Sequence, residues 1–240
     1  MQKISAHTYF AVSEHRATNN TKSPKVILIF GGWLTLPFYY SSLIKKFRSK
    51  GFDCVLYIPK RKLVAIGTEY AHMLHAADAA TADAKERLGD LENPDKTEVA
   101  VFGVSLGSIF AIEIAKRIKQ VKRVALLTPT GDFIEHVKAW QNHFYFKRIV
   151  ASQPTNPLES GELLNKIGSL KNLNLMKDKD VLLGFAVKDS IMHQAIAREL
   201  AIKLREVQVT PVVVEVKGGH NTGLFRYLFN KDYVEFLTRE

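Results

Sequence analysis

The chain has 240 residues, of which 46% are hydrophobic and 24% charged, a composition typical of a globular domain with a sizeable core. No apolar run approaches the roughly 20 residues of a transmembrane helix. Residues 1–25 also lack the apolar block of a signal peptide, so we expect a cytoplasmic protein without stable membrane insertion. The net charge of +10 is spread over small groups of Lys and Arg, without a zinc-finger spacing or a basic-aromatic tract, and we expect no nucleic-acid partner.

The N-terminal region predicts one strand, a loop and then a buried strand. Apolar and polar side chains alternate over residues 4–12, from Ile4 to Val12, which indicates a half-buried strand, and polar residues 13–23 follow as a loop. Residues 25–30 form a continuous apolar run, typical of a strand covered on both faces of a parallel sheet. A helix with one apolar side is expected after Pro37, ending at Gly51.

Five further apolar runs alternate with helical patterns along the rest of the chain. Cys54, the single cysteine, lies in the first of these runs and is expected to be a buried free thiol. The helix after Ser105 is apolar nearly all round, as a covered central helix should be. Strands are expected at 52–58, 99–102, 122–127, 180–187 and 212–216, and helices at 68–88, from Ser105 onward, across Ile191, Ala195, Leu200 and Leu204, and at 222–237.

This alternation predicts one α/β domain spanning residues 1–240. Strands that alternate with helices form a mostly parallel sheet with right-handed crossovers and helices on both faces, a three-layer arrangement. The interval from Pro129 to Lys179 is longer than a crossover needs. We therefore expect a cap of short helices inserted at about residues 130–179.

A G-x-S-x-G motif, Gly103-Val-Ser105-Leu-Gly107, lies where one predicted strand gives way to a helix. A turn this sharp brings backbone against neighbouring backbone, so residues without side chains are needed on either side of the serine. The helix that begins after Ser105 directs free N–H groups toward negative charge that develops near this serine.

Two other reactive residue types follow strands of the same sheet. Ligands of an open parallel sheet bind at the carboxyl ends of its strands. Asp189 follows the strand at 180–187, and His220 follows the strand at 212–216, after Gly218 and Gly219. A serine, an acid and a histidine are therefore expected at one edge of the sheet, in that order along the chain.

These residues resemble the α/β-hydrolase superfamily, whose nucleophile elbow carries G-x-S-x-G and whose triad runs Ser, Asp, His along the chain. The resemblance covers residues 25–238 and implies the α/β-hydrolase fold. It implies that Ser105 is the nucleophile, that His220 is the general base and then acid, and that Asp189 orients the imidazole.

The resemblance also implies an oxyanion hole made of two backbone N–H groups. Leu106 N–H is one donor, and the other is Trp33 N–H or, with a shift of one residue, Gly32 N–H. Many α/β-hydrolases have His-Gly in this loop, whereas here Phe30 precedes Gly31 and Gly32. Backbone donors survive that difference, but the second donor is left open between two residues.

The identity of the acid and the type of reaction each have a second candidate. Asp132 follows the preceding strand at the same edge and is the rival acid, in which case Asp189 would cap a helix. The activity we predict is hydrolysis of a carboxylic ester or thioester of a small or lipophilic acyl group. An acyltransferase, or a non-catalytic binding protein of the same fold, is the competing hypothesis, because a fold does not fix a function. The oligomeric state is not predicted.

No cofactor or metal is expected. His72 and His75 are three residues apart on a predicted helix, without a third ligand, and His193 is expected in the first turn of another helix. The expected cap is dense in aromatic residues between 132 and 149. They could pack against the sheet or line an acyl pocket above Ser105. Lys138, Lys147 and Arg148 lie among them, which raises contact with an anionic lipid surface as a further hypothesis.

Overall fold

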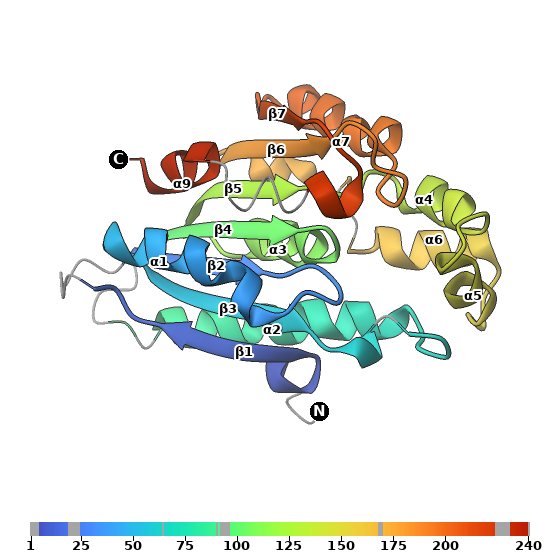
Figure 1. Cartoon of the computed structure of the whole chain (residues 1–240), viewed down its shortest axis with the longest axis horizontal. Coiled ribbons are helices and arrows are strands. Elements are labelled where there is room, and N and C mark those ends of the chain that lie inside the picture. The colour runs from blue at the N-terminus through green and yellow to red at the C-terminus, as the bar shows by residue number, and fades with distance from the viewer. Residues whose placement is uncertain are drawn as a thin grey trace.

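The centre of the structure is a seven-stranded sheet with the strand order β1-β3-β2-β4-β5-β6-β7. This computed structural model describes residues 5–18, 25–63, 65–89, 91, 97–167, 170–223 and 231–239. β1 pairs antiparallel with β3, and every other pairing is parallel, so the expected three-layer, mostly parallel fold is confirmed (Figure 1). The strands are β1 (Phe10–His15), β2 (Lys25–Phe30), β3 (Asp53–Pro59), β4 (Glu98–Val104), β5 (Val121–Leu127), β6 (Asp180–Ala186) and β7 (Val212–Val216).

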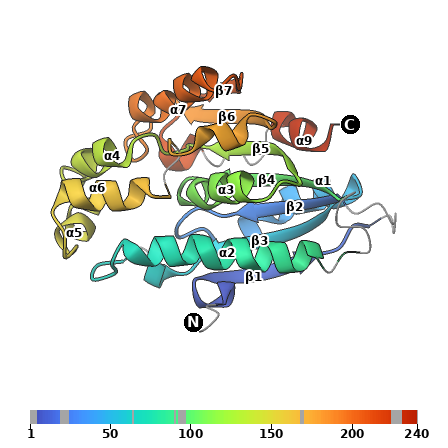
Figure 2. The same cartoon turned by 180° about the vertical axis from the view of Figure 1, so that it is seen from behind.

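Helices cover both faces of the sheet. One face is packed against α1 and α9, and the other against α2, α3 and α7, which lie nearest the viewer in Figure 2. The described α-helices are α1 (Ser41–Ser49), α2 (Ala71–Gly89), α3 (Leu106–Arg117), α4 (Phe133–Trp140), α5 (Phe146–Ala151), α6 (Pro157–Asn165), α7 (Gln194–Glu206) and α9 (Lys231–Thr238). The 3₁₀ helices are η1 (Ala6–Thr8), η2 (Pro37–Tyr40), η3 (Arg61–Leu63) and η5 (Leu173–Met176).

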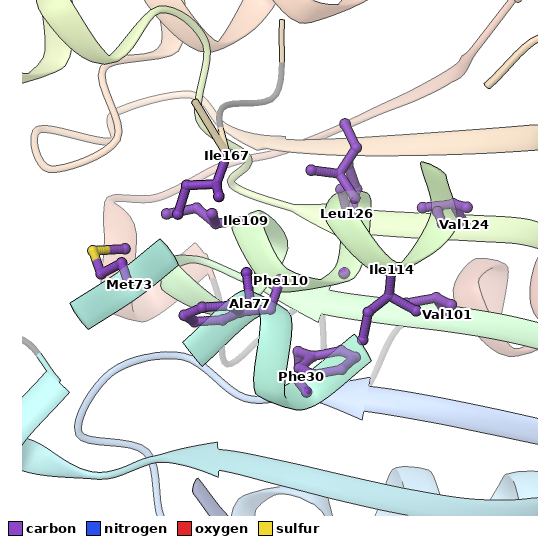
Figure 3. Packing of buried hydrophobic residues seen from close by; sticks show 14 of the residues in the cluster. Phe30, Met73, Ala77, Val101, Ile109, Phe110, Ile114, Val124, Leu126 and Ile167 are labelled. Carbon is purple, nitrogen blue, oxygen red and sulfur yellow. The ribbon is translucent and has the colours of Figure 1, made fainter. Parts of the chain in front are cut away.

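Successive side chains of a strand point to opposite faces of the sheet, so each strand contributes to the core on both faces. In β2, Val26, Leu28 and Phe30 pack toward α2 and α3, whereas Ile27 and Ile29 pack toward α1. α3 is buried on nearly all sides, as expected, because it packs on the sheet and against α2 and η5. Figure 3 shows the core on the α2 and α3 face, where side chains of these two helices pack against one another and against the strands.

The segment between β5 and β6 holds α4, α5 and α6 beyond the carboxyl ends of the strands (Figures 1 and 2). α4 and α6 approach closely at Gly161, where a Cβ would lie 2.6 Å from Ile134 Cα. The Trp140 indole Nε1 donates a hydrogen bond of 2.8 Å to the Ile191 carbonyl, which ties α4 to the loop after β6.

Two sequence expectations near the N-terminus are wrong in their boundaries. Residues 6–8 form a 3₁₀ helix instead of a strand, because the Ser5 hydroxyl accepts a hydrogen bond from His7 N–H. β1 begins at Phe10 and runs to His15, where we expected a loop, because antiparallel pairing with β3 satisfies its backbone groups. Ile4 and residues 19–23 of the expected loop lie outside the described residues.

The helix expected across Ile191 to Leu204 begins later than predicted, and one of its inward positions is wrong. α7 starts at Gln194, and Ala195 is exposed while Ala197 and Leu200 are buried. The loop after β6 forms turns that keep Ile191 out of the helical register. For the C-terminal helix the structure describes Lys231–Thr238, and residues 224–230 lie outside the described ranges.

Cys54 is a buried free thiol, as the sequence predicted. Burial and the nearby Asp53 carboxylate raise the pKa of this thiol to about 12, so it is protonated at neutral pH. In the part of the chain that the structure describes, no helix has the length and hydropathy needed to span a bilayer.

The corner between β4 and α3 has no space for a side chain at Gly107, which generates a prediction. A Cβ there would lie 2.2 Å from the Phe30 carbonyl oxygen. We expect Gly107→Ala to lower the free energy of unfolding by roughly 2 kcal/mol or more, since backbone must move to admit the methyl group. Denaturant unfolding measures this change.

Gly89→Ala is the matched control, because a Cβ at Gly89, the last residue of α2, meets no described atom within 4 Å. Alanine is also the better helix former, so this variant should be as stable as the wild type or slightly more stable. Equal stability of the two variants would contradict the packing described at Gly107.

Candidate active site

The backbone at Ser105 adopts an unusual conformation that sets its side chain apart from the sheet. Its φ of 51° and ψ of −122° lie outside the strand and helix regions, and its N–H donates a 2.8 Å hydrogen bond to the Leu127 carbonyl. A Cβ at Gly103 would lie 2.5 Å from Ala111 Cβ. The two glycines of the motif are therefore required by close packing, for the reason that the sequence indicated.

Ser105 and His220 are in hydrogen-bond contact although they are far apart in the sequence. The distance from Ser105 Oγ to His220 Nε2 is 2.9 Å. Gly218 precedes this histidine with a φ of +134°, a conformation that favours glycine, and its carbonyl accepts a 2.8 Å hydrogen bond from Lys188 N–H. That bond joins the loop after β7 to the loop after β6.

Asp189 lies on the other side of the imidazole. Its Oδ2 is 2.7 Å from His220 Nδ1, and its Oδ1 accepts hydrogen bonds of 2.9 and 2.8 Å from the N–H groups of Ile191 and Met192. The Asp189 side chain is 1% exposed. Three donors therefore face the Asp189 carboxylate, and an imidazole that donates Nδ1–H to it has Nε2 free to accept a hydrogen bond.

Asp132, the rival acid, occupies a different environment. It is the N-cap of α4, where Oδ1 accepts a 2.6 Å hydrogen bond from Ile134 N–H and a 3.2 Å bond from Asn165 Nδ2. The structure therefore gives Asp132 a capping role and brings Asp189, not Asp132, to His220.

The three residues expected at the oxyanion hole line the same cavity as Ser105, but their N–H groups differ in whether they already have a hydrogen-bond acceptor. The Gly32 N–H donates a 3.0 Å hydrogen bond to the Tyr40 hydroxyl. Among the described residues, no group accepts a hydrogen bond from the Trp33 or Leu106 N–H. These two donors are available to a ligand, whereas Gly32 N–H is already occupied.

Tyr40 is a contributor that the sequence pattern does not reveal. The pattern marks it only as an apolar residue of a helix, and its ring is indeed fully buried. Its hydroxyl, however, accepts from Gly32 N–H and donates to Thr35 Oγ1, while Thr35 Oγ1 donates to the Gly32 carbonyl. These bonds fix the loop that carries Trp33, and no periodicity in the sequence marks them.

A cavity of about 570 Å³ extends from Ser105 beneath α4, α5 and α6. Its described lining includes no Lys, Arg, Asp or Glu side chain. The aromatic residues expected in the cap supply part of its wall, and His220 lies at the same site as Ser105. The main apolar lining residues are Met73, Ile109, Phe133, Trp140, Phe146 and Leu164.

Three other histidines considered from the sequence lie on α2 and at the start of α7. His72 and His75 are exposed on α2, and His193 occupies the N-cap position of α7. No group of three or more His, Cys, Asp or Glu side chains that could hold a metal ion occurs among the described residues.

In sequence, the chain matches no protein-family model and no curated protein. Its structure is similar to acylaminoacyl peptidase of Pyrococcus horikoshii, with a TM-score of 0.70 and 15% identity, covering 97% of this chain and 42% of that chain. It is also similar to carboxyl esterase 2 of the fungus Tuber melanosporum, with a TM-score of 0.68 and 16% identity, covering 98% of this chain and 83% of that one.

A thermostable esterase of Pseudomonas putida is a third similar structure, with a TM-score of 0.63 and 20% identity, covering 99% of this chain and 82% of the esterase. This chain thus spans less than half of the peptidase but most of each esterase. At such identities the likeness shows the fold alone, and it confirms the α/β-hydrolase fold that the sequence resemblance implied.

His136, behind the site, generates a prediction about pH. Its Nε2 accepts a 3.1 Å hydrogen bond from Gly131 N–H, and burial lowers its pKa from 6.5 to about 4. Between these values the unfolded chain takes up the proton and the folded chain does not. The free energy of unfolding should therefore fall by roughly 3 kcal/mol from this group as the pH drops from about 6.5 to about 4.

Denaturant unfolding of His136→Gln at several pH values tests this, because the amide keeps an acceptor for Gly131 but does not titrate. The variant should lose that part of the pH dependence. His72→Gln removes an exposed histidine of α2 and should retain the wild-type pH dependence. Identical pH profiles for wild type and His136→Gln would contradict the burial of a neutral imidazole.

Proposed function

We propose that the protein is a serine hydrolase that transfers an acyl group from an ester or thioester to water through an acyl-enzyme on Ser105. The observation that carries this proposal is the chain of two hydrogen bonds, 2.9 Å from Ser105 Oγ to His220 Nε2 and 2.7 Å from His220 Nδ1 to Asp189 Oδ2. A serine hydroxyl is a weak nucleophile at neutral pH, and this arrangement supplies the base that it needs.

In the first half of the reaction, Ser105 Oγ attacks the acyl carbon while its proton moves to His220 Nε2. The resulting imidazolium is stabilised by the Asp189 carboxylate, which accepts from Nδ1–H and stays ionised. The tetrahedral intermediate then collapses: its bond to the alcohol or thiol breaks, and His220 gives the proton to that leaving group. The acyl group remains on Ser105.

In the second half, water replaces the leaving group. His220 Nε2 takes a proton from the water as its oxygen attacks the acyl-enzyme, and returns it to Ser105 Oγ as the carboxylic acid departs. Both tetrahedral intermediates carry an oxyanion. We assign its two donors to the N–H groups of Leu106 and Trp33, because the Tyr40 hydroxyl already occupies Gly32 N–H.

The lining and size of the cavity favour a substrate with a lipophilic acyl group, which the cavity would bind. Its described walls carry no Lys, Arg, Asp or Glu side chain, and its size of about 570 Å³ suits a medium-sized apolar group. A charged acyl group would lose its hydration there without gaining an ionic partner. We propose that α4, α5 and α6 form a cap over this cavity within a single domain.

Replacing the nucleophile tests the proposal. Ser105→Ala should lower kcat on the order of a million-fold, since the three residues act as a unit, and should abolish labelling by a fluorophosphonate probe. Ser49→Ala is the matched control, because Ser49 is exposed at the end of α1 and its hydroxyl bonds, among the described residues, only the Lys46 carbonyl. A wild-type protein that does not react with the probe would favour a non-catalytic binding protein.

The acid is tested by two asparagine variants. Asp189→Asn should lower kcat by about ten-thousand-fold, because the amide favours the wrong imidazole tautomer. Asp132→Asn should keep nearly full activity, since asparagine caps a helix as well as aspartate. The reverse outcome would assign the acid to Asp132.

The identity of the acyl acceptor, water or another nucleophile, is tested by competition between them. With an ester of a lipophilic acid, free acid should be the main product even when an alcohol or amine is added. An acyltransferase would instead give mainly the transferred acyl group.

A further inference from the structure

The mouth of the cavity carries large apolar side chains that protrude into solvent. Phe144 is 87% exposed, Phe38 is 62% exposed, and Leu34 and Leu36 are about half exposed. Single exposed apolar side chains are common, but a group of large ones at one place marks a site that binds another molecule or a membrane surface. We call the following six residues the apolar rim: Leu34, Leu36, Phe38, Tyr39, Phe144 and Tyr145.

The apolar rim is one surface although it comes from two segments of the chain. Leu34, Tyr39 and Tyr145 all line the cavity, so both segments border its opening. The Trp33 and Tyr145 rings are 5.0 Å apart between centroids, which places the loop after β2 against the turn between α4 and α5. Both segments lie beyond the carboxyl ends of the strands (Figure 1).

Cations accompany the apolar rim. Residues 33–40, 60–70 and 141–153 contain five Lys or Arg residues and a single carboxylate, Glu69. The 60–70 segment lies beside α5, because Gly67 N–H donates to Ser152 Oγ and Gln153 Nε2 donates to the Thr68 carbonyl. The five cations, all exposed, are Lys60, Arg61, Lys62, Lys147 and Arg148.

Four of these cations are available to an external partner, whereas the Lys60 ammonium donates a hydrogen bond to the His7 carbonyl. Lys147 and Arg148 form no ion pair with a carboxylate among the described residues, and neither do Arg61 and Lys62. Exposed aromatic side chains among unpaired cations are the composition that binds an anionic lipid surface, where the rings enter the headgroup region and the cations face the lipid phosphates.

We propose that the apolar rim and its five cations form a peripheral docking surface for anionic lipid. Charge complementarity favours this occupant, and so does the position of the cavity, which opens through the rim. A protein seated there would cover the opening, whereas a lipid surface supplies molecules that can enter it. Resting on the proposed function, this identifies the substrate as an ester that partitions into lipid, which reaches Ser105 directly from the lipid surface.

Cosedimentation of the full chain with vesicles tests the surface without relying on activity. One set of vesicles contains phosphatidylcholine alone, and the other contains about 30% phosphatidylglycerol. We expect binding to the anionic vesicles, little binding to the zwitterionic ones, and a loss of binding at high salt. Ser105→Ala should bind as the wild type does.

Paired variants distinguish docking through the apolar rim and its cations from nonspecific attraction of the vesicles by the protein's net positive charge. Phe38→Ser/Phe144→Ser should weaken partitioning at least about tenfold, and so should Lys147→Gln/Arg148→Gln. Ile202→Ser changes an exposed apolar residue on α7, and Lys45→Gln/Lys50→Gln removes the same charge from α1 and its C-cap. Both controls should bind nearly as the wild type does.

Three outcomes would overturn the proposal: no binding to either vesicle, equal losses in the rim variants and their controls, or a dimer that the Phe38/Phe144 variant dissociates. The last would assign the surface to a second copy of the chain. Vesicle binding by a protein that does not react with the fluorophosphonate would keep the docking surface and reject the proposed hydrolase. Probe labelling without vesicle binding would keep the proposed hydrolase and reject the docking surface.

Discussion

The hydrogen bond between Asp189 and His220 joins the loops that follow two neighbouring strands, and the arrangement of the site depends on it. β6 and β7 are adjacent and parallel, so both loops leave the same edge of the sheet. The bond from Lys188 N–H to the Gly218 carbonyl fixes the distance between them. Because two backbone N–H groups also hold the Asp189 carboxylate, the imidazole has one orientation, with Nε2 toward Ser105.

A second constraint acts on the other side of Ser105, through the absence of side chains. Gly107 lies against the Phe30 and Gly31 carbonyls, and a Cβ at Gly32 would lie 3.5 Å from Ser105 Cβ. The elbow and the loop after β2 therefore approach each other at backbone distance. This approach places the loop that carries Trp33 against the corner formed by Ser105 and Leu106, and the Tyr40 hydroxyl holds the loop there.

The inside of the cavity is largely apolar, whereas the surface around its opening carries cations. The two regions therefore have different roles in the proposed function. The described lining is largely apolar and has no Lys, Arg, Asp or Glu, so burial of an acyl group there is favourable and electrostatic interactions near Ser105 are strengthened. The cations lie outside, on α5 and on the loop after β3, where water solvates them. In the proposed docking they attract an anionic surface without entering the site.

Local pattern in the sequence determined the strands, the covered helix after Ser105, the elbow and the edge of the sheet at which Asp189 and His220 lie, because strand periodicity, glycine and chain order are local properties. It did not determine where β1 and α7 begin, since a capping hydroxyl at Ser5 and turns after β6 override the apolar periodicity. It also left two acids and two oxyanion donors open. The assignments proposed for them rest on tertiary contacts: Asp189 contacts His220, Asp132 meets the first turn of α4, and Gly32 N–H meets Tyr40. These are contacts between side chains and backbone that no spacing in the sequence encodes.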